Sequence, residues 1–255
     1  MTRILLSGCA GRMGREIAAL AADNGNVTVV AGVDRVTAPA EFPVFADLGA
    51  CRVEADVLVD FSNPSALPGI LAYCTKNKLP VLLAATGYSP EEEQAVREAS
   101  RQIAVFRSAN MSLGVNVLRA LVQKACAALG ADYDVEILEM HHNQKLDAPS
   151  GTAKMLAEAA AEALPYTPEF VYDRHERRAR RDRREIGIHS LRGGTVVGEH
   201  QVLFAGQDEV ITLSHSAGSR RVFAAGALRA AAFLADKGPG LYTMEDLIAE
   251  ALKTK

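Results

Sequence analysis

The sequence predicts an α/β protein: a Rossmann-like domain with a doubly wound parallel sheet, and a second α+β domain with a mixed or antiparallel sheet. Two observations predict it. The first hundred residues alternate short apolar runs with helical segments, whereas residues 185–217 hold consecutive strand-like runs without helices between them. Strands covered on both faces read as near-continuous apolar runs, and strands joined by short turns pair antiparallel.

The elements of the first part follow from apolar runs that glycine, proline or polar residues interrupt. The helix expected over 90–102 begins after Ser89, a capping residue, and carries acidic residues in its first turn. The expected strands are 3–7, 27–33, 57–61, 80–85 and 103–106, and the other helices are 13–23 and 65–78.

The pattern changes at residue 113, where a long apolar helix is expected. We expect the boundary near 108–112, with the final helices returning to the first domain, so that residues 1–112 and 219–255 form one domain and residues 113–218 the other. The elements expected here are helices over 113–129, 152–164, 221–236 and 244–252 and strands over 133–140, 185–192, 195–205 and 209–217.

Composition excludes several classes of protein. The 255 residues are 49% hydrophobic and 23% charged with a net charge of −3, which gives no general attraction to nucleic acid or membrane. The four cysteines show no metal or redox spacing. No apolar run resembles a signal peptide or approaches the roughly 20 residues that cross a bilayer. We therefore expect a cytoplasmic protein with reduced thiols and no metal site.

A glycine-rich turn, "GCAGRMG", follows the first strand and opens a helix, with glycines at 8, 11 and 14. Small residues there let the backbone approach a pyrophosphate, whose charge the helix amides face. Asp34 follows Gly14 by twenty positions, where a carboxylate would bind the adenosine ribose. Asp34 favours NADH, and Arg35 could accept the phosphate of NADPH, so the sequence permits both cofactors.

A second stretch, "MHHNQKLDAPSGTA" (140–153), concentrates proton-active and anion-binding groups. His141 and Lys145 could deliver a proton as hydride arrives. Ser150 or Thr152 lies near the start of a helix, whose amides suit a carboxylate. Other interpretations stay open: adjacent histidines on a strand point to opposite sides, and Asp147 could be a turn residue.

Residues 139–153 resemble the signature of the dihydrodipicolinate reductase family, E-x-H-H-x-x-K-x-D-A-P-S-G-T-A, at every fixed position. Further similarities extend along the whole chain. They include "GCAGRMG", "VDFSNP" (59–64), "ATGYS" (85–89), "SANMSLGVN" (108–116), "GIHSLRGGTVVGEH" (187–200) and "FAAGALRAA" (223–231).

The resemblance implies a cytoplasmic homotetramer that reduces 4-hydroxy-tetrahydrodipicolinate, a small dicarboxylate of the diaminopimelate route to lysine, with NADH or NADPH. Hydride would pass to C4 of the substrate ring as its hydroxyl leaves as water. The second domain would bind substrate and form the oligomer, and a hinge would close the site. The implied catalytic residues are His141 and Lys145, and the implied substrate-binding residues are His142, Gly151 and Thr152. The implied cofactor-binding residues are Gly8, Cys9, Ala10, Gly11, Arg12, Met13, Asp34, Arg35, Ala84, Ala85, Thr86, Ser108, Ala109, Asn110 and Met111.

One departure from the family is Ala84-Ala85 where Gly-Thr is usual, which removes a hydroxyl but leaves the backbone amides. We expect Lys145 to supply a proton, while His141 shapes the local field or shares the transfer.

Two other functions compete with this interpretation. Residues 174–185 hold seven arginines, which could mark a nucleic-acid-binding dinucleotide sensor, although interspersed acids favour a mobile, solvated loop that attracts a dicarboxylate. A semialdehyde dehydrogenase would need a reactive cysteine, and the candidate Cys126 lies within an apolar helix, where a packing thiol is expected.

Overall fold

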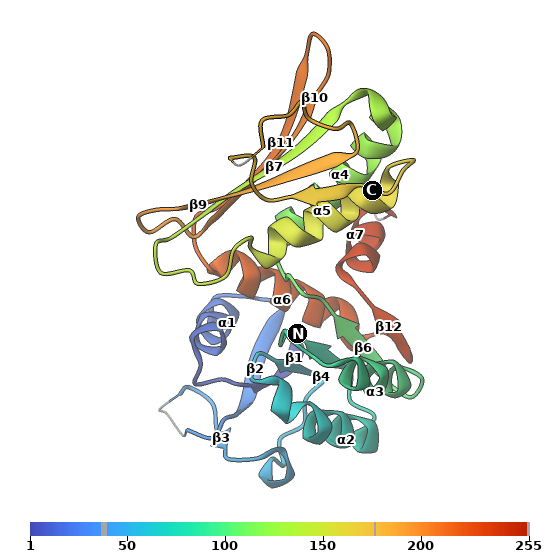
Figure 1. The fold of residues 1–255 in the computed structure, drawn as a ribbon. Coiled ribbons are helices and arrows are strands. Elements are labelled where there is room, and N and C mark those ends of the chain that lie inside the picture. The colour runs from blue at the N-terminus through green and yellow to red at the C-terminus, as the bar shows by residue number, and fades with distance from the viewer. Residues whose placement is uncertain (37–39, 176, 254–255) are drawn as a thin grey trace. The chain divides into compact units, whose positions relative to one another are not determined.

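A computed structural model describes residues 1–36, 40–175 and 177–253 of the chain. The chain divides into two compact units, one of Met1–Leu113 with Arg220–Lys255 and one of Gly114–Ser219. The first unit is therefore built from two separate segments of the sequence, and the second is a continuous insertion between them (Figure 1).

The first unit contains a seven-stranded sheet whose strands are all parallel, in the order β12-β6-β5-β4-β1-β2-β3. The order reverses between β1 and β4, which is the arrangement of a doubly wound dinucleotide-binding fold. The Rossmann-like prediction is thus confirmed. The strands are β1 (Thr2–Ser7), β2 (Val27–Val33), β3 (Val44–Phe45), β4 (Val57–Asp60), β5 (Val81–Leu83), β6 (Ala104–Arg107) and β12 (Gly240–Tyr242).

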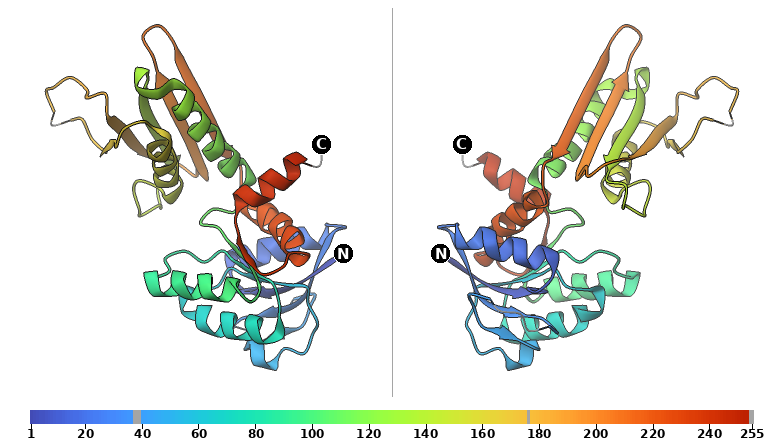
Figure 2. Two further views of the ribbon diagram at one scale, coloured as in Figure 1. Left: turned by 90° about the vertical axis from the view of Figure 1, so that its right-hand side faces the viewer. Right: turned by 90° about the vertical axis from the view of Figure 1, so that its left-hand side faces the viewer.

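Helices cover both faces of this sheet (Figures 1 and 2). On one face, α1 (Arg12–Ala22), α6 (Arg221–Ala235) and α7 (Met244–Lys253) share a core cluster with Ile4 and Val59. On the other, α2 (Leu67–Asn77) and α3 (Pro90–Ser100) pack around Leu5 and Leu58. The alternation of strand side chains between two covered faces explains why these strands read as continuous apolar runs.

The second unit holds a five-stranded mixed sheet in the order β11-β10-β7-β9-β8. β10 pairs antiparallel with β7 and β11, while β9 runs parallel to β7 and β8. The long helices α4 (Leu113–Leu129) and α5 (Gly151–Ala163) pack against one face of it. The strands are β7 (Asp134–His141), β8 (Glu169–Val171), β9 (Glu185–Arg192), β10 (Gly198–Ala205) and β11 (Val210–Ala217).

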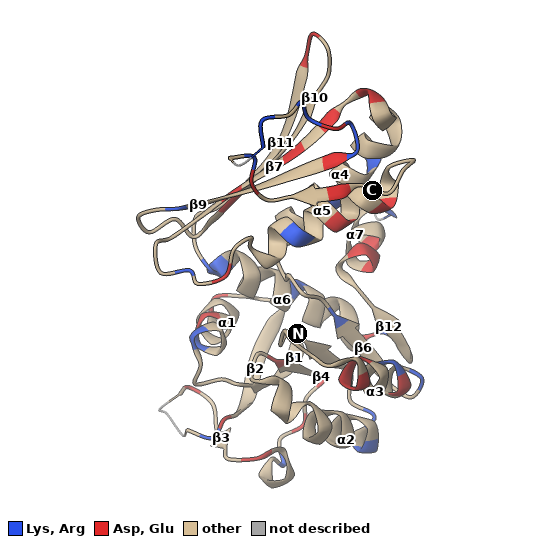
Figure 3. Ribbon diagram, viewed as in Figure 1, with Lys and Arg blue, Asp and Glu red and all other residues tan. Residues whose placement is uncertain are grey.

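The arginine-rich segment is a loop in which Arg178, Arg180, Arg183 and Arg184 are exposed, as expected from sequence, but its other arginines are held by ion pairs. Arg181 lies against the sheet, with ion pairs to Asp134 at 2.8 Å and Glu136 at 3.0 Å. Arg174 and Arg177 both pair with Glu185, whose side chain is 6% exposed. Figure 3 shows the blue of this segment beside the acidic red of the second unit. The structure leaves Glu176, one of the acids of the prediction, outside the described residues.

Candidate active site

The glycine-rich turn after β1 is tightly packed, and two of its glycines are sterically required. Gly8 has a φ of +78°, which other residues adopt only at a cost. A Cβ atom on Gly14 would lie 2.2 Å from the carbonyl oxygen of Gly8. The start of α1 can therefore approach the turn closely, which is the geometry that presents backbone amides to a pyrophosphate.

Asp34 lies at the end of β2 and is joined to this turn. Its Oδ2 accepts a hydrogen bond from the Ala10 amide at 3.0 Å, and its Oδ1 accepts one from the Val36 amide at 3.1 Å. Gly8, Gly11, Asp34 and Arg35 line one cavity of about 770 Å³ in the first unit. These four residues, which the sequence analysis assigned to the cofactor, line one depression, which also includes residues it did not single out, among them Asp47, Asn63 and Tyr73.

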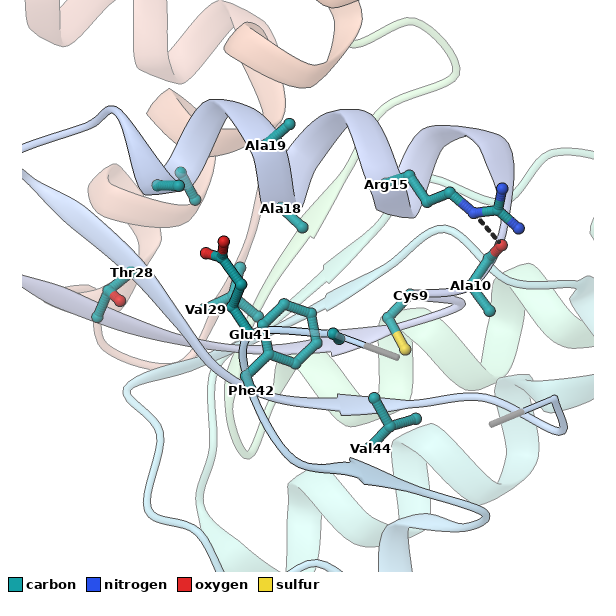
Figure 4. A pocket seen from close by; sticks show the side chains of 13 residues that line it. Cys9, Ala10, Arg15, Ala18, Ala19, Thr28, Val29, Glu41, Phe42 and Val44 are labelled. Carbon is teal, nitrogen blue, oxygen red and sulfur yellow. Dashed lines mark hydrogen bonds between the residues drawn. The ribbon is translucent and has the colours of Figure 1, made fainter. Parts of the chain in front are cut away.

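Cys9 and Ala10 instead line a second cavity of about 400 Å³ on the α1 side of the sheet. Figure 4 shows α1 on one side of it and the Phe42 ring on the other, with Arg15 turned back to the Ala10 carbonyl oxygen. Arg12 is exposed at the first position of α1, and Met13 packs against the core. The turn therefore separates two cavities, and the predicted residues are divided between them.

The other predicted cofactor-binding residues follow β5 and β6, which are neighbours in the sheet. Ala85 and Met111 are buried, at 7% and 3% exposed. Arg107 holds the Ala85 carbonyl oxygen at 2.9 Å. Residues 84–86 and 108–111 thus form two adjacent loops, the second braced by a hydrogen bond from the Ser112 amide to Asn110 Oδ1.

In the second unit, Glu139 organises the end of β7. Its side chain is fully buried, and Arg192 donates two hydrogen bonds to it at 2.9 and 2.8 Å. Nδ1 of His141 lies 2.6 Å from the same carboxylate. Burial opposes ionisation of Glu139, but the hydrogen bonds from Arg192, Ser190 and His141 outweigh it and lower its pKa to about 2.

Lys145 lies on the loop after β7 and is more accessible than His141. Its Nζ donates to Asp147 Oδ1 at 2.8 Å, and this contact lowers the pKa of Asp147. The Lys145 side chain is 19% exposed and that of Asp147 is 62% exposed, so the pair faces solvent. His142 is half-buried, and its Nδ1 accepts a hydrogen bond from the Gln144 amide. The loop therefore presents an ammonium group rather than the imidazole of His141.

The start of α5 is held by Ser150. Its Oγ accepts the Ala153 amide at 3.1 Å, which confirms the predicted cap, and its own amide donates to Glu139 at 3.1 Å. A Cβ atom on Gly151 would meet no atom within 4 Å, so this first turn borders open space. Thr152 follows in the same turn. The buried carboxylate of Glu139 thus contacts both His141 and the first turn of α5, where the predicted carboxylate-binding residues lie.

His200 on β10 extends this network. Its Nε2 lies 2.9 Å from Ser150 Oγ, and its ring meets that of His141 edge to face at 5.2 Å between centroids. Burial, then the charge of His141, lowers its pKa from 6.5 to about 4. The unfolded chain therefore binds a proton at higher pH than the folded chain does.

This difference predicts a loss of stability in acid. The free energy of unfolding should fall as the pH decreases from about 6.5 to about 4, by on the order of 2–3 kcal/mol from His200 alone. Denaturant unfolding at several pH values should show a shallower slope for His200→Gln than for the parent. Equal slopes for the parent and His200→Gln would contradict this prediction.

Sequence reasoning missed Glu139, Arg192 and His200 as parts of the site. Glu139 is the first fixed position of the matched signature, and this could have identified it as part of the site. Arg192 and His200 lie 53 and 50 residues from their partners, so only the fold brings them together.

Cys126 is 1% exposed and burial raises its pKa to about 11, as expected of a packing thiol. No cluster of metal ligands occurs among the residues that the structure describes.

Comparisons with known proteins identify the family of the chain. The family model "Dihydrodipicolinate reductase, N-terminus" matches residues 2–111, and "Dihydrodipicolinate reductase, C-terminus" matches residues 114–248. The chain is 54% identical to the 4-hydroxy-tetrahydrodipicolinate reductase of Caldanaerobacter subterraneus subsp. tengcongensis, covering 97% of this chain and 98% of that one. It is 47% identical to the enzyme of that name from Clostridium tetani, covering 97% of each.

A solved structure of dihydrodipicolinate reductase from Paenisporosarcina sp. TG-14 superposes with a TM-score of 0.80 at 27% identity, covering 95% of this chain and 97% of that one. Diaminopimelate dehydrogenase of C. glutamicum shares the fold, with a TM-score of 0.59 at 16% identity over 100% of this chain and 98% of that one. With two family models spanning most of its length and a relative at 54% identity, the chain belongs to the dihydrodipicolinate reductase family.

Proposed function

We propose that this chain reduces 4-hydroxy-tetrahydrodipicolinate to tetrahydrodipicolinate with a nicotinamide dinucleotide, in the diaminopimelate route to lysine. The observation that carries the proposal is the chain of contacts that joins Lys145 to the first turn of α5. Lys145 pairs with Asp147, whose carbonyl oxygen accepts from Arg192 at 2.7 Å, and Arg192 in turn holds Glu139. A proton source and an anion-binding helix start are thereby built as one unit.

The first unit suits the dinucleotide. The close approach of Gly14 to Gly8 would let the start of α1 face the pyrophosphate, and Asp34 after β2 would accept a ribose hydroxyl. Gly8–Met13, Asp34 and Arg35 would hold the adenosine diphosphate part, and the loops at 84–86 and 108–111 would line the nicotinamide. The reduced nicotinamide supplies the hydride when bound.

The second unit would bind the dicarboxylate and manage the proton. Gly151 and Thr152 would bind one carboxylate at the start of α5, and His142 would contact the substrate beside them. Lys145 would donate a proton to the hydroxyl that leaves as water, which balances the hydride gained by the ring carbon. His141 is 9% exposed, which favours a role in setting the local field over direct donation.

The first test is turnover of enzymatically generated 4-hydroxy-tetrahydrodipicolinate, followed as oxidation of NADH or NADPH. The cavity beside Asp34 carries two carboxylates, Asp34 and Asp47, and one guanidinium, Arg35. Because a 2′-phosphate would add negative charge there, we expect kcat/KM to favour NADH by about tenfold.

Asp47→Asn should reduce the preference for NADH, because it removes one of the two negative charges of this cavity. The local structure should be kept, since the amide oxygen of asparagine can still accept the hydrogen bond from the Ala50 amide that Asp47 accepts at 3.0 Å. An absence of turnover by folded protein that binds NADH would refute the reductase proposal. A preference for NADPH would refute only the choice of cofactor.

Assembly and location follow from the same proposal. The sheet face opposite α4 and α5 carries Leu138, Met140, Leu191 and Leu203, with Leu191 47% exposed. An apolar face of this kind suits contacts between copies of the chain, and we infer a homotetramer assembled through it. None of the helices in the described ranges is long and apolar enough to cross a membrane. We place the enzyme in the cytoplasm, where its small-molecule substrate would be made.

A further inference from the structure

Glu139 is a buried charge whose acceptor capacity is fully used. The residue is 1% exposed, and its two oxygens accept from two guanidinium N–H groups of Arg192, Nδ1 of His141, the amide of Ser150 and the side chain of Ser190. A carboxylate offers about four lone-pair sites, so these donors occupy its acceptor capacity. A buried carboxylate is tolerated only when it is paired in this way, and removing its charge leaves the partners unsatisfied.

The carboxylate also determines which nitrogen of His141 carries a proton. An ionised carboxylate can only accept, so Nδ1 of His141 must be the donor across the 2.6 Å contact. Nε2 is then the atom that gains or loses a proton. A Cβ atom on Gly198 would lie 3.0 Å from this Nε2, and glycine at that position keeps the space beside it open.

The same carboxylate fixes the first turn of α5 and the loop before it. The Ser150 amide donates to Oε1, and Ser150 is the N-terminal cap of the helix, so a displacement of Glu139 moves the turn that begins with Gly151. Arg192 adds a second tether, because the Nη2 that donates to Glu139 also donates to the Asp147 carbonyl oxygen at 2.7 Å. The end of β7, the start of α5 and Arg192 at the end of β9 therefore share one anchor.

We propose that Glu139 is a positioning residue that holds His141, the start of α5 and the Lys145 loop in a single geometry for the reaction. This inference rests on the proposed reductase function and deepens it. Glu139 acts through its neighbours and does not contact the substrate. Its neutral isostere, glutamine, has one acceptor oxygen, and its amide donors would oppose those of Arg192 and His141. Nδ1 of His141 must then accept from that amide or lose its partner.

The experiment compares Glu139→Gln with Glu136→Gln in the full-length protein. Glu136 is a matched control, because it lies on the same strand and also pairs with an arginine and a histidine, Arg181 at 3.0 Å and His189 at 2.9 Å. Its side chain lies on the opposite face of the sheet, away from α4 and α5. Each sample is checked for parental NADH affinity and oligomeric state before it is used.

We expect Glu139→Gln to lower kcat/KM by about thirtyfold and to change the shape of its pH profile, while Glu136→Gln stays within about threefold. Nitrogen NMR of the His141 ring should show the proton on Nδ1 in the parent and a shift of it toward Nε2 in Glu139→Gln. Affinity for pyridine-2,6-dicarboxylate, a planar dicarboxylate probe, should fall with Glu139→Gln alone. These readouts respond to geometry and protonation, which a general loss of stability would not change selectively.

If Glu139→Gln does not fold, Arg192→Lys provides an alternative test of the positioning role. It keeps the charge beside Glu139 but loses the paired donors and the tether to Asp147, so kcat/KM and dicarboxylate affinity should both fall by about tenfold. Parental kcat/KM, probe affinity and His141 protonation in the folded variants would overturn the positioning role. If the parent itself shows no turnover, the reductase proposal fails, while the NMR and probe measurements still decide whether Glu139 positions the site.

Discussion

Lys145→Ala should reduce kcat/KM for 4-hydroxy-tetrahydrodipicolinate by about a hundredfold or more and leave the Kd for NADH unchanged. General acids contribute roughly 10²–10⁴-fold to a rate, and Lys145 is the accessible proton donor of the loop after β7. Its partner Asp147 is itself largely exposed, so the ammonium can leave the pair and reach a bound substrate. The dinucleotide residues belong to the other unit, which explains the expected separation of the two effects.

Two comparisons make this prediction specific. Lys154→Ala removes an exposed lysine of α5 close in sequence to the site and should stay within about twofold of the parent. His141→Ala should lower activity less than Lys145→Ala does, because the buried imidazole contributes a field and a contact rather than the transferred proton. Parental kcat/KM in folded Lys145→Ala would remove this residue from the mechanism.

The second large effect concerns the glycine turn. Gly14→Ala should weaken NADH binding at least tenfold and lower the free energy of unfolding by about 1–3 kcal/mol, because the added methyl group would lie 2.2 Å from the Gly8 carbonyl oxygen and 2.7 Å from Cys9 Cα. Neither atom belongs to a flexible side chain, so α1 must move away from the turn. Titration of NADH fluorescence and denaturant unfolding would measure the two changes.

Gly25→Ala provides the matched comparison, since a Cβ atom there would meet nothing within 4 Å. It should retain the parental Kd for NADH. Tight NADH binding by Gly14→Ala would show that the dinucleotide does not depend on this close approach, and the assignment of the turn would have to be abandoned.

The fold could be predicted from sequence where burial leaves a local pattern. β1, β4 and β5 are covered on both faces, and their continuous apolar runs were recognised for that reason. β3, β8 and β12 were missed, because two or three residues at the edge of a sheet carry no periodicity. β10 begins at Gly198 rather than at 195, since Thr195–Val197 looks strand-forming but precedes the first paired residue.

The site divides in the same way. Gly8, Gly14 and Asp34 could be predicted, because their spacing reflects one turn and one strand end. The pairing of Glu139 with Arg192 could not, because it depends on the register between β7 and β9. The ion pairs of Arg177 and Arg181 could not be predicted either, since charge density in a sequence does not reveal which carboxylates the fold brings near.

The divided first unit has a consequence for how the protein is made. Helix α6 supplies Ala224, Ala227 and Ala231 to the same core cluster as Ile4 and Val59, yet it lies beyond the whole second unit in the chain. At about 5–20 residues per second, a ribosome needs on the order of ten seconds to add the intervening residues. During that interval one face of the nascent sheet has α1 but lacks α6 and α7, while the second unit is still being made. A chaperone that shields this apolar face during synthesis would therefore raise the yield of folded enzyme more than one acting after release.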